Sequence, residues 1–445
     1  MLIDFTFKNF HSFKKEVTFS MLAANTVKEN EGEEEPFSNT VNGFGNKKYL
    51  RVATVYGANA SGKSNFIKAM AFFRNMILLS SNNENILEAY QDYFLFDNNS
   101  FNEPSSFEMN FIAENRKFRY GFEILKNQIE SEWLFETKKD SQRENYCFIR
   151  EKKKIKVNTR IFKGTRGLAD KTRYNSLFLS TTAQFNVEIS MLIKEFFRKS
   201  FNVLSGLDET IQYTAGQYMH DSNMRQEMLD FIKLIDLGIK DITVNDESVP
   251  YNEHVKKTIM ASRILSPEVI EDIAKNGNLR KLEISTAHES FDEGNSLGLI
   301  SFPFKKESLG TQKAFSFLGP WFDTLRRGGI LIIDEFGTSL HTKLSKEFLR
   351  LFQSSLNLFG AQLIVTTHDT NLLHRDLLRR DQIWFTEKDL YGVSDLYSLV
   401  EYKINQASSV RNDASFSRDY LAGKYGAIPF LGDVERFIKE YSHEQ

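Results

Sequence analysis

The chain has 445 residues, 41% of them hydrophobic, so it can bury a large core or more than one domain. Its 57 Lys and Arg residues nearly balance its 59 Asp and Glu residues, so no global charge favours nucleic acid or an anionic membrane. The single cysteine, Cys147, excludes an intramolecular disulfide and a multi-cysteine zinc site, and it suits a reducing compartment. The chain lacks a signal-peptide pattern, and no window approaches about eighteen uninterrupted apolar residues. We therefore expect a cytoplasmic protein without a membrane-spanning segment.

Apolar and polar residues alternate through much of the first part of the chain, and the 40 phenylalanines are expected to lie mostly in the core. Residues 25–48 are polar, include an acidic run, and predict an exposed loop. Residues 51–56 form a mostly apolar run that suits the middle of a sheet. Apolar residues at helical spacing between positions 66 and 77 predict an amphipathic helix. Alternation predicts strands at residues 3–7, 10–19, 107–112 and 118–124.

The middle of the chain differs in character from both ends. Residues 138–173 are strongly basic, and we interpret them as a solvated pair of strands; the alternative is a contact for duplex DNA. Residues 174–281 are predicted to be mostly helical, and the absence of sustained heptads favours a compact insert over a long coiled coil. The α/β pattern then returns, with buried strands predicted at residues 330–333, 363–367 and 383–385 and helices near 315–325 and 344–355.

Residues 57–64, with the sequence GANASGKS, match the complete P-loop pattern. A buried strand precedes the motif and an amphipathic helix follows it, which is the context that the motif requires. The glycines allow backbone N–H groups to surround phosphates, Lys63 is expected to reach the β and γ phosphates of ATP, and Ser64 to ligate Mg²⁺. The predicted phosphate-binding residues are Gly57, Asn59, Ala60, Ser61, Gly62, Lys63, Ser64 and Asn65.

A second candidate element is the apolar run at residues 330–333, which ends in Asp334 and Glu335. Carboxylates at this position lie at the carboxyl edge of a parallel sheet, where ligands bind. Asp334 is expected to hold Mg²⁺, and Glu335 to orient and deprotonate the attacking water. An Asp-Glu pair after an apolar strand is a weak signal by itself, and the upstream P-loop makes it a strong one.

Two further segments are candidates for contacts with the γ-phosphate. His368 ends another buried strand, and we predict that it bonds this phosphate, in preference to an ordinary histidine at a strand end. Residues 308–312, with the sequence SLGTQ, precede a predicted helix. Ser308, Gly310 and Gln312 either contact a phosphate or belong to a simple helix N-cap, and geometry alone leaves both interpretations open.

The P-loop, residues 308–312, the Asp-Glu pair and His368, in this order along the chain, resemble the ABC ATPase superfamily, including SMC heads. By this resemblance, residues 308–312 take the place of the signature motif, residues 339–341 that of the D-loop, and His368 that of the switch histidine. The segment departs from the family's Leu-Ser-Gly-Gly-Gln pattern at Thr311. Some relatives hold the adenine near the position of residues 10–13, and Gln91 is a candidate for the Q-loop glutamine.

The chain is more closely similar to bacterial RloA and AbiL-type ATPases, which also resemble the ATPase parts of the OLD nucleases and of anti-phage systems. That resemblance implies an ATPase that serves a separately encoded, often nuclease-like effector in abortive infection, with a phage component as trigger. OLD nucleases carry a further nuclease domain, whereas only about 75 residues follow His368, so we expect any nuclease activity in a partner. The motifs that carry the resemblance lie at residues 9–13, 17–21, 56–65, 307–312 and 420–429.

We therefore predict an α/β fold of the ABC/SMC-like P-loop head class, with a mixed β lobe, a parallel-sheet lobe and an inserted helical region. The expected segments are an N-terminal ATPase lobe (1–173), a helical insert (174–290) and a C-terminal ATPase lobe (291–445). In an ABC head the signature completes the site of a second head, so the expected active unit is a head-to-tail dimer around two ATP molecules. Binding of nucleic acid stays open, and no membrane partner is expected.

Two alternative functions remain. The first is a DNA-repair or recombination ATPase of the SMC kind that clamps duplex DNA directly; the absence of a long coiled coil counts against it. The second is a scaffold that binds ATP without turnover, against which the intact Lys63, Asp334 and Glu335 argue.

Overall fold

The computed structural model describes residues 1–27, 37–90, 92–139, 141, 143–204, 207–235, 238–250, 278–404, 408–409 and 415–429. These residues form two compact units. Unit 1 comprises Met1–Val203, Arg327–Thr338 and Ser345–Gln445, and unit 2 comprises Leu204–Arg326 and Ser339–Leu344. The predicted acidic run in the first loop and Gln91 lie outside the described residues. No helix in the described ranges combines the length and apolar character needed to cross a membrane.

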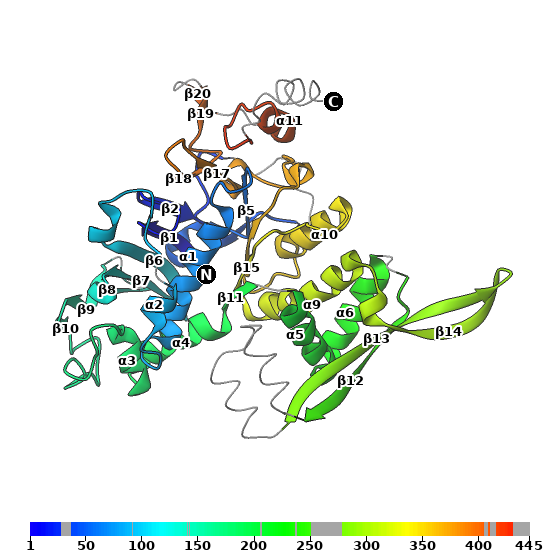
Figure 1. Cartoon of the computed structure of the whole chain (residues 1–445), viewed down its shortest axis with the longest axis horizontal. Coiled ribbons are helices and arrows are strands. Elements are labelled where there is room, and N and C mark those ends of the chain that lie inside the picture. The colour runs from blue at the N-terminus through cyan, green and yellow to red at the C-terminus, as the bar shows by residue number, and fades with distance from the viewer. Residues whose placement is uncertain are drawn as a thin grey trace, which may run out of the picture. The chain divides into compact units, whose positions relative to one another are not determined.

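Unit 1 contains a seven-stranded antiparallel sheet in the order β10-β9-β8-β7-β6-β1-β2 (Figure 1). Burial alternates along β6, as the period of two in its sequence predicts, so one face of the sheet is directed to the core. The strands predicted at residues 3–7, 107–112 and 118–124 are confirmed, whereas the strand predicted at 10–19 begins only at Val17, because Phe10 and Phe13 close a turn. Within the basic segment, β9 and β10 form the expected strand pair. The strands are β1 (Leu2–Lys8), β2 (Val17–Ser20), β6 (Ser105–Ala113), β7 (Arg116–Leu125), β8 (Gln128–Lys138), β9 (Asn145–Glu151) and β10 (Lys154–Val157).

The second sheet of unit 1 has six strands in the order β11-β15-β16-β5-β17-β18. Its centre is parallel: β16 pairs with both β15 and β5, and β5 pairs with β17. Each residue of β5, β15 and β16 is buried, which accounts for their mostly apolar sequences. The strands are β5 (Val52–Gly57), β11 (Phe201–Leu204), β15 (Ile330–Ile333), β16 (Gln362–Thr366), β17 (Ile383–Lys388) and the antiparallel β18 (Ser394–Ser398).

Helix α1 (Lys63–Leu79) packs between these two sheets through aromatic side chains (Figure 1). Phe73 stacks on Phe122 of β7, with ring centroids 5.3 Å apart. Phe66 contacts Phe19 of β2 at 5.0 Å, and Phe19 contacts Trp384 of β17 at 4.9 Å. The phenylalanines thus join both sheets and α1 into one core. The remaining elements of this unit are α2 (Ile86–Tyr90), α3 (Phe178–Gln184), α4 (Glu188–Lys199), α10 (Thr342–Gln353), α11 (Phe416–Leu421), β3 (Thr40–Asn42), β4 (Lys48–Leu50), β19 (Lys403–Ile404), β20 (Ser408–Ser409), η1 (Phe44–Asn46), η2 (Ser100–Asn102), η4 (Thr370–Leu372) and η5 (Arg380–Gln382).

Unit 2 combines helices with a three-stranded antiparallel sheet, β12-β13-β14. The prediction of a mostly helical segment is therefore wrong at β12 and at the start of β13. The missed signal is a period of two: Ile242 in β12 and both Ile284 and Thr286 in β13 are buried. Polar residues between them make this alternation weak in the sequence. The elements are α5 (Leu207–His220), α6 (Ser222–Leu234), β12 (Asp241–Pro250), β13 (Asn278–Asp292), β14 (Asn295–Pro303), η3 (Phe304–Lys306) and α9 (Leu309–Arg327), whose last residue belongs to unit 1.

Candidate nucleotide-binding site

The register of the parallel strands brings the predicted motifs of unit 1 to one edge. Thr386 of β17 lies opposite Gly57 at the end of β5, and Thr366 of β16 lies opposite Val55. On the other side of β16, Ile333 lies opposite Val365, so Asp334 follows at the same edge. This edge is formed by the carboxyl ends of the strands, where parallel α/β sheets bind ligands.

The P-loop glycines are required by close packing. A Cβ added to Gly57 would lie 2.4 Å from the carbonyl oxygen of Thr386. Gly62 has φ of 123°, and a Cβ there would lie 2.6 Å from Oγ of Ser394. Both positions therefore exclude any side chain, because real Cβ atoms do not approach other atoms so closely. The helix α1 begins at Lys63, directly after this turn.

Lys63 is buried, and its ammonium lies within the P-loop. Its Nζ donates hydrogen bonds to the carbonyl oxygens of Gly57 at 2.8 Å and Ala58 at 2.9 Å. Burial lowers the pKa of Lys63 to about 8, although the carboxylates of Asp334 and Glu335 act in the opposite direction. A phosphate group next to Lys63 would favour its charged form, because an opposite charge offsets the loss of solvation.

A network of hydroxyl groups connects the P-loop to β17, to β18 and to Ser12. Oγ of Ser61 lies 2.6 Å from Oγ1 of Thr386, and Oγ of Ser394 donates to the carbonyl oxygen of Ser61 at 2.6 Å. Ser394 also donates to Oγ of Ser12 at 2.8 Å, and Nδ2 of Asn65 donates to the same Ser12 oxygen at 2.9 Å. Sequence reasoning assigned no role to Ser12, Ser394 or Thr386. Ser12 lies in one of the quoted motifs, but its partners become visible only in the folded chain.

Thr366 holds both carboxylate residues that follow β15. The hydroxyl of Thr366 donates to Oδ1 of Asp334. Its oxygen, Oγ1, accepts the backbone N–H of Glu335 at 2.8 Å. Glu335 has φ of 54°, a left-handed conformation that is uncommon for a residue with a side chain. The hydrogen bond to Thr366 thus holds the backbone that carries the exposed Glu335 side chain. Sequence reasoning assigned no role to Thr366.

Replacing Thr366 with Val should lower the turnover of ATP about tenfold to a hundredfold with little change in its binding. Val keeps the shape of Thr but leaves the N–H of Glu335 without its hydroxyl partner, and a misplaced catalytic group is expected to cost rate in this range. Steady-state phosphate release gives kcat and KM, and Thr366→Ser, which keeps the hydroxyl, should restore most of kcat. Equal turnover by the Val and wild-type proteins would remove the positioning role.

His368 follows β16 at the same edge, with its side chain exposed. Partial burial, and next the charge of Lys63, lower the pKa of His368 below its ordinary value, while Glu335 and Asp334 oppose this shift. The charges of Lys63, Glu335 and Asp334 thus act on the imidazole, and its contact with a γ-phosphate stays a prediction. The neighbouring Thr367 donates to the carbonyl oxygen of Phe336 at 2.7 Å and fixes the backbone before His368.

The oxygen groups at this edge fit Mg²⁺. A hydroxyl at the first turn of α1, Ser64, and the carboxylate of Asp334 are the hard oxygen ligands that this ion prefers. No group of three or more His, Cys, Asp or Glu side chains with metal-ligand geometry occurs among the described residues. Mg²⁺ usually keeps several waters and binds through one or two protein ligands together with nucleotide phosphates, and Ser64 and Asp334 would serve as these protein ligands. When bound, the ion would neutralise charge on the β and γ phosphates.

Residues 308–312 belong to unit 2, so they are described apart from the P-loop. Oγ of Ser308 accepts the N–H of Thr311 at 3.1 Å and lies 2.9 Å from Oγ1 of Thr311, so the N-cap interpretation is confirmed. A Cβ added to Gly310 would lie 2.8 Å from the carbonyl oxygen of Ser339, which places the predicted signature beside the predicted D-loop. Gln312 donates to the carbonyl oxygen of Glu307 at 2.9 Å. Phosphate contacts of this segment stay a prediction.

Residues 10–13, near whose position some relatives hold the adenine, have two buried phenylalanine rings, and the place of the adenine stays a prediction. Phe10 and Phe13 are 1% and 0% exposed. Phe10 stacks on Phe72 at 5.4 Å, and Phe13 meets Phe7 edge-on at 4.8 Å. Their rings belong to the core, because burying an aromatic ring removes a large apolar surface from water and thereby stabilises the fold.

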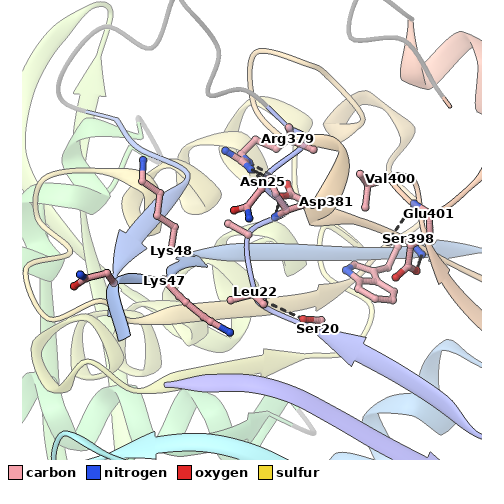
Figure 2. Close-up of a pocket in the computed structure, with 15 residues that line it drawn as sticks. Ser20, Leu22, Asn25, Lys47, Lys48, Arg379, Asp381, Ser398, Val400 and Glu401 are labelled. Atoms are coloured by element: carbon pink, nitrogen blue, oxygen red, sulfur yellow. Dashed lines mark hydrogen bonds and ion pairs between the residues drawn. The ribbon is translucent and has the colours of Figure 1, made fainter. Parts of the chain in front are cut away.

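A cavity of about 790 Å³ lies elsewhere in unit 1 (Figure 2). Arg379 and Asp381 form a buried ion pair at its wall, with an N–O distance of 2.8 Å, and Asp381 accepts the N–H of Ala24 at 2.8 Å. These residues precede β17, whereas Thr386 near the P-loop lies in its second half, so the cavity is not part of the nucleotide site. Figure 2 shows the labelled lining residues around it: Ser20, Leu22, Asn25, Lys47, Lys48, Arg379, Asp381, Ser398, Val400 and Glu401.

A P-loop on a parallel sheet, with an Asp-Glu pair at the end of a strand in the same sheet, defines an ABC-type P-loop ATPase head with an α/β fold. Residues 52–374 match the family model described as "AAA domain, putative AbiEii toxin, Type IV TA system", and the chain belongs to this family. No curated protein matches the chain. The finer resemblance to RloA and AbiL-type ATPases stays a prediction.

Solved SMC head domains are similar to the chain. An SMC head bound to the C-terminal winged-helix domain of ScpA is 12% identical, with a TM-score of 0.39, over 92% of this chain and 99% of that one. The SMC head domain from Thermotoga maritima is 14% identical, with a TM-score of 0.37, over 89% and 98%. An SMC head with an extended coiled coil, bound to the C-terminal domain of ScpA and derived from Pyrococcus furiosus, is 15% identical, with a TM-score of 0.31, over 91% and 97%.

Proposed function

We propose that the protein binds ATP with Mg²⁺ and hydrolyses it at the edge formed by β5, β15 and β16. The observation that carries this proposal is the joint placement of Lys63, the Thr366-held pair Asp334 and Glu335, and His368, whose charges act on one another. Lys63 binds the phosphates and Asp334 holds the metal ion. Glu335 orients and deprotonates water, and His368 contacts the γ-phosphate.

The active unit in this proposal is a head-to-tail dimer with two ATP molecules between its heads. Ser308, Gly310 and Gln312 of one chain then complete the site of the other. The exposed side chain of Ser308, at the start of α9, suits such a contact, because helix N-termini favour anions. Hydrolysis removes the bridging γ-phosphate and loosens the pair, so ATP acts as a two-state switch.

The switch is proposed to control a separately encoded, nuclease-like effector in anti-phage abortive infection, with a phage component as trigger. The name of the matched family, which refers to a type IV toxin–antitoxin system, supports this role. Copurification of wild-type protein and Glu335→Gln with the products of neighbouring genes, with and without ATP, tests it. We expect a stable complex with a neighbour that separates or rearranges when ATP is added.

A chain that purifies alone and clamps onto added duplex DNA in the presence of ATP would contradict the effector role. It would favour the repair-type ATPase and leave the assignment of the ATP site unchanged.

A further inference from the structure

A second pocket of unit 1, with a volume of about 470 Å³, lies at one end of the antiparallel sheet and shares no residue with the nucleotide site. Three turns and a helix start meet there. Asn115 lies in the turn before β7 and Arg116 is the first residue of that strand, and Lys138 and Lys139 come from the end of β8. The turn that follows β10 contributes Arg160, Ile161 and Lys163, and α4 begins at the pocket with Glu188.

The charge of this pocket is strongly positive. Lys138, Lys139, Arg160 and Lys163 line it with exposed side chains, and in the described part of the chain none of them has an acidic group within ion-pair distance. Arg116, a fifth cation, is neutralised by Glu136, which is 2% exposed and lies 2.7 Å from Nε of Arg116. Besides Glu136, only Glu188 adds a negative charge to the lining residues that the structure describes.

Two other cations of the same basic segment have acidic partners. Lys152 pairs with Glu130 at 3.1 Å, and the buried Arg150 lies 3.5 Å from Glu132. Four cations from two segments therefore lie around one cavity, and among its described lining residues only Glu188 offers a negative charge that is not already paired with Arg116. Like charges at short range repel, and an anion in the cavity would remove that repulsion.

We propose that this pocket binds the phosphate groups of a ligand that carries at least two of them, either along a nucleic-acid backbone or on a free polyphosphate. Several lysines act as point charges for phosphate oxygens, and the planar guanidinium of Arg160 suits a bidentate contact. Binding here does not depend on hydrolysis of ATP, so the proposal stands apart from the proposed function.

The test compares two double variants that remove the same charge from the same basic segment. Lys138→Ala with Lys163→Ala changes the pocket, whereas Lys153→Ala with Lys154→Ala changes exposed lysines outside the pocket lining. Both pairs are made in the full chain with Lys63→Ala, so that the P-loop does not compete for phosphates. The probes are a labelled oligothymidine of about twelve nucleotides, followed by fluorescence anisotropy across a salt series, and inorganic tripolyphosphate, followed by thermal shift.

The pocket variant should weaken binding of the oligothymidine at least about tenfold at low salt. The slope of log affinity against log salt should fall by about 1.4, because each neutralised phosphate of a single strand contributes about 0.7. The control pair should leave both values unchanged. Tripolyphosphate binding alone, lost in the pocket variant, would support the proposal with a free phosphorylated ligand. Failure of both probes to bind the parent chain, or equal losses in the two double variants, would overturn it.

Discussion

Glu335→Gln should bind ATP as tightly as the wild-type protein and hydrolyse it at least about a hundredfold more slowly, because loss of a general base typically costs about 10² to 10⁴ in rate. The backbone of Glu335 is fixed by the hydroxyl of Thr366, so Gln is expected to keep the position of the side chain. Gln is nearly isosteric with Glu but cannot accept the proton of the attacking water. The γ-phosphate is therefore retained, and the ATP-bound dimer should accumulate.

Two measurements on the same sample check this expectation. Phosphate release gives the rate, and light scattering coupled to size exclusion gives the mass with and without ATP. Glu347→Gln is the matched control: Glu347 is an exposed glutamate on α10 that pairs with Arg350 at 3.1 Å, outside the site. The control should behave as wild type. Normal turnover by Glu335→Gln would contradict its role as the base, and slow turnover without an ATP-dependent dimer would contradict the trapped pair.

The extent to which the site could be predicted depended on the kind of signal each residue leaves in the sequence. Lys63, Asp334 and Glu335 belong to contiguous motifs next to buried strands, and the register of β5, β15 and β16 joins them at one edge as expected. Thr366 left no such signal, because its importance comes from two hydrogen bonds to residues about thirty positions earlier. A polar residue at the end of a predicted buried strand is the only hint available.

Some strands of the fold could be predicted from their own sequence, whereas others depend on partners that are distant in the chain. Every residue of strands β15 and β16 is buried, and apolar residues form all of β15 and the centre of β16, so composition alone identified them. Strands β12 and β13 contain many polar residues, few of their described side chains are buried, and their pairing, Ile242 opposite Thr286, joins residues that are far apart in the chain. Helical periodicity in the preceding α5 and α6 favoured the continuation of helix. Pairing partners of this kind cannot be found from propensity, because strand stability depends on neighbours that the sequence does not name.

The head-to-tail arrangement predicts that two inactive variants restore activity to each other. Lys63→Ala removes the phosphate contact of the P-loop, and Ser308→Arg blocks the signature with a large charged side chain. Ser308 is exposed, so Arg can be accommodated outside the core, with loss of an N-cap that contributes about 1 kcal/mol. Each variant alone should be inactive, because every site in its homodimer lacks one half.

A mixed dimer contains one intact site, formed by the P-loop of the Ser308→Arg chain and the signature of the Lys63→Ala chain. Equal amounts mixed before ATP is added should therefore reach about one quarter of wild-type turnover, because about half of the pairs are mixed and each has one working site of two. Mixing Lys63→Ala with a chain that carries both substitutions is the control, because no combination of these chains contains an intact site. Equal inactivity of the two mixtures would mean that residues 308–312 do not complete the site of a second chain, and the N-cap role of Ser308 would then be sufficient to explain this segment.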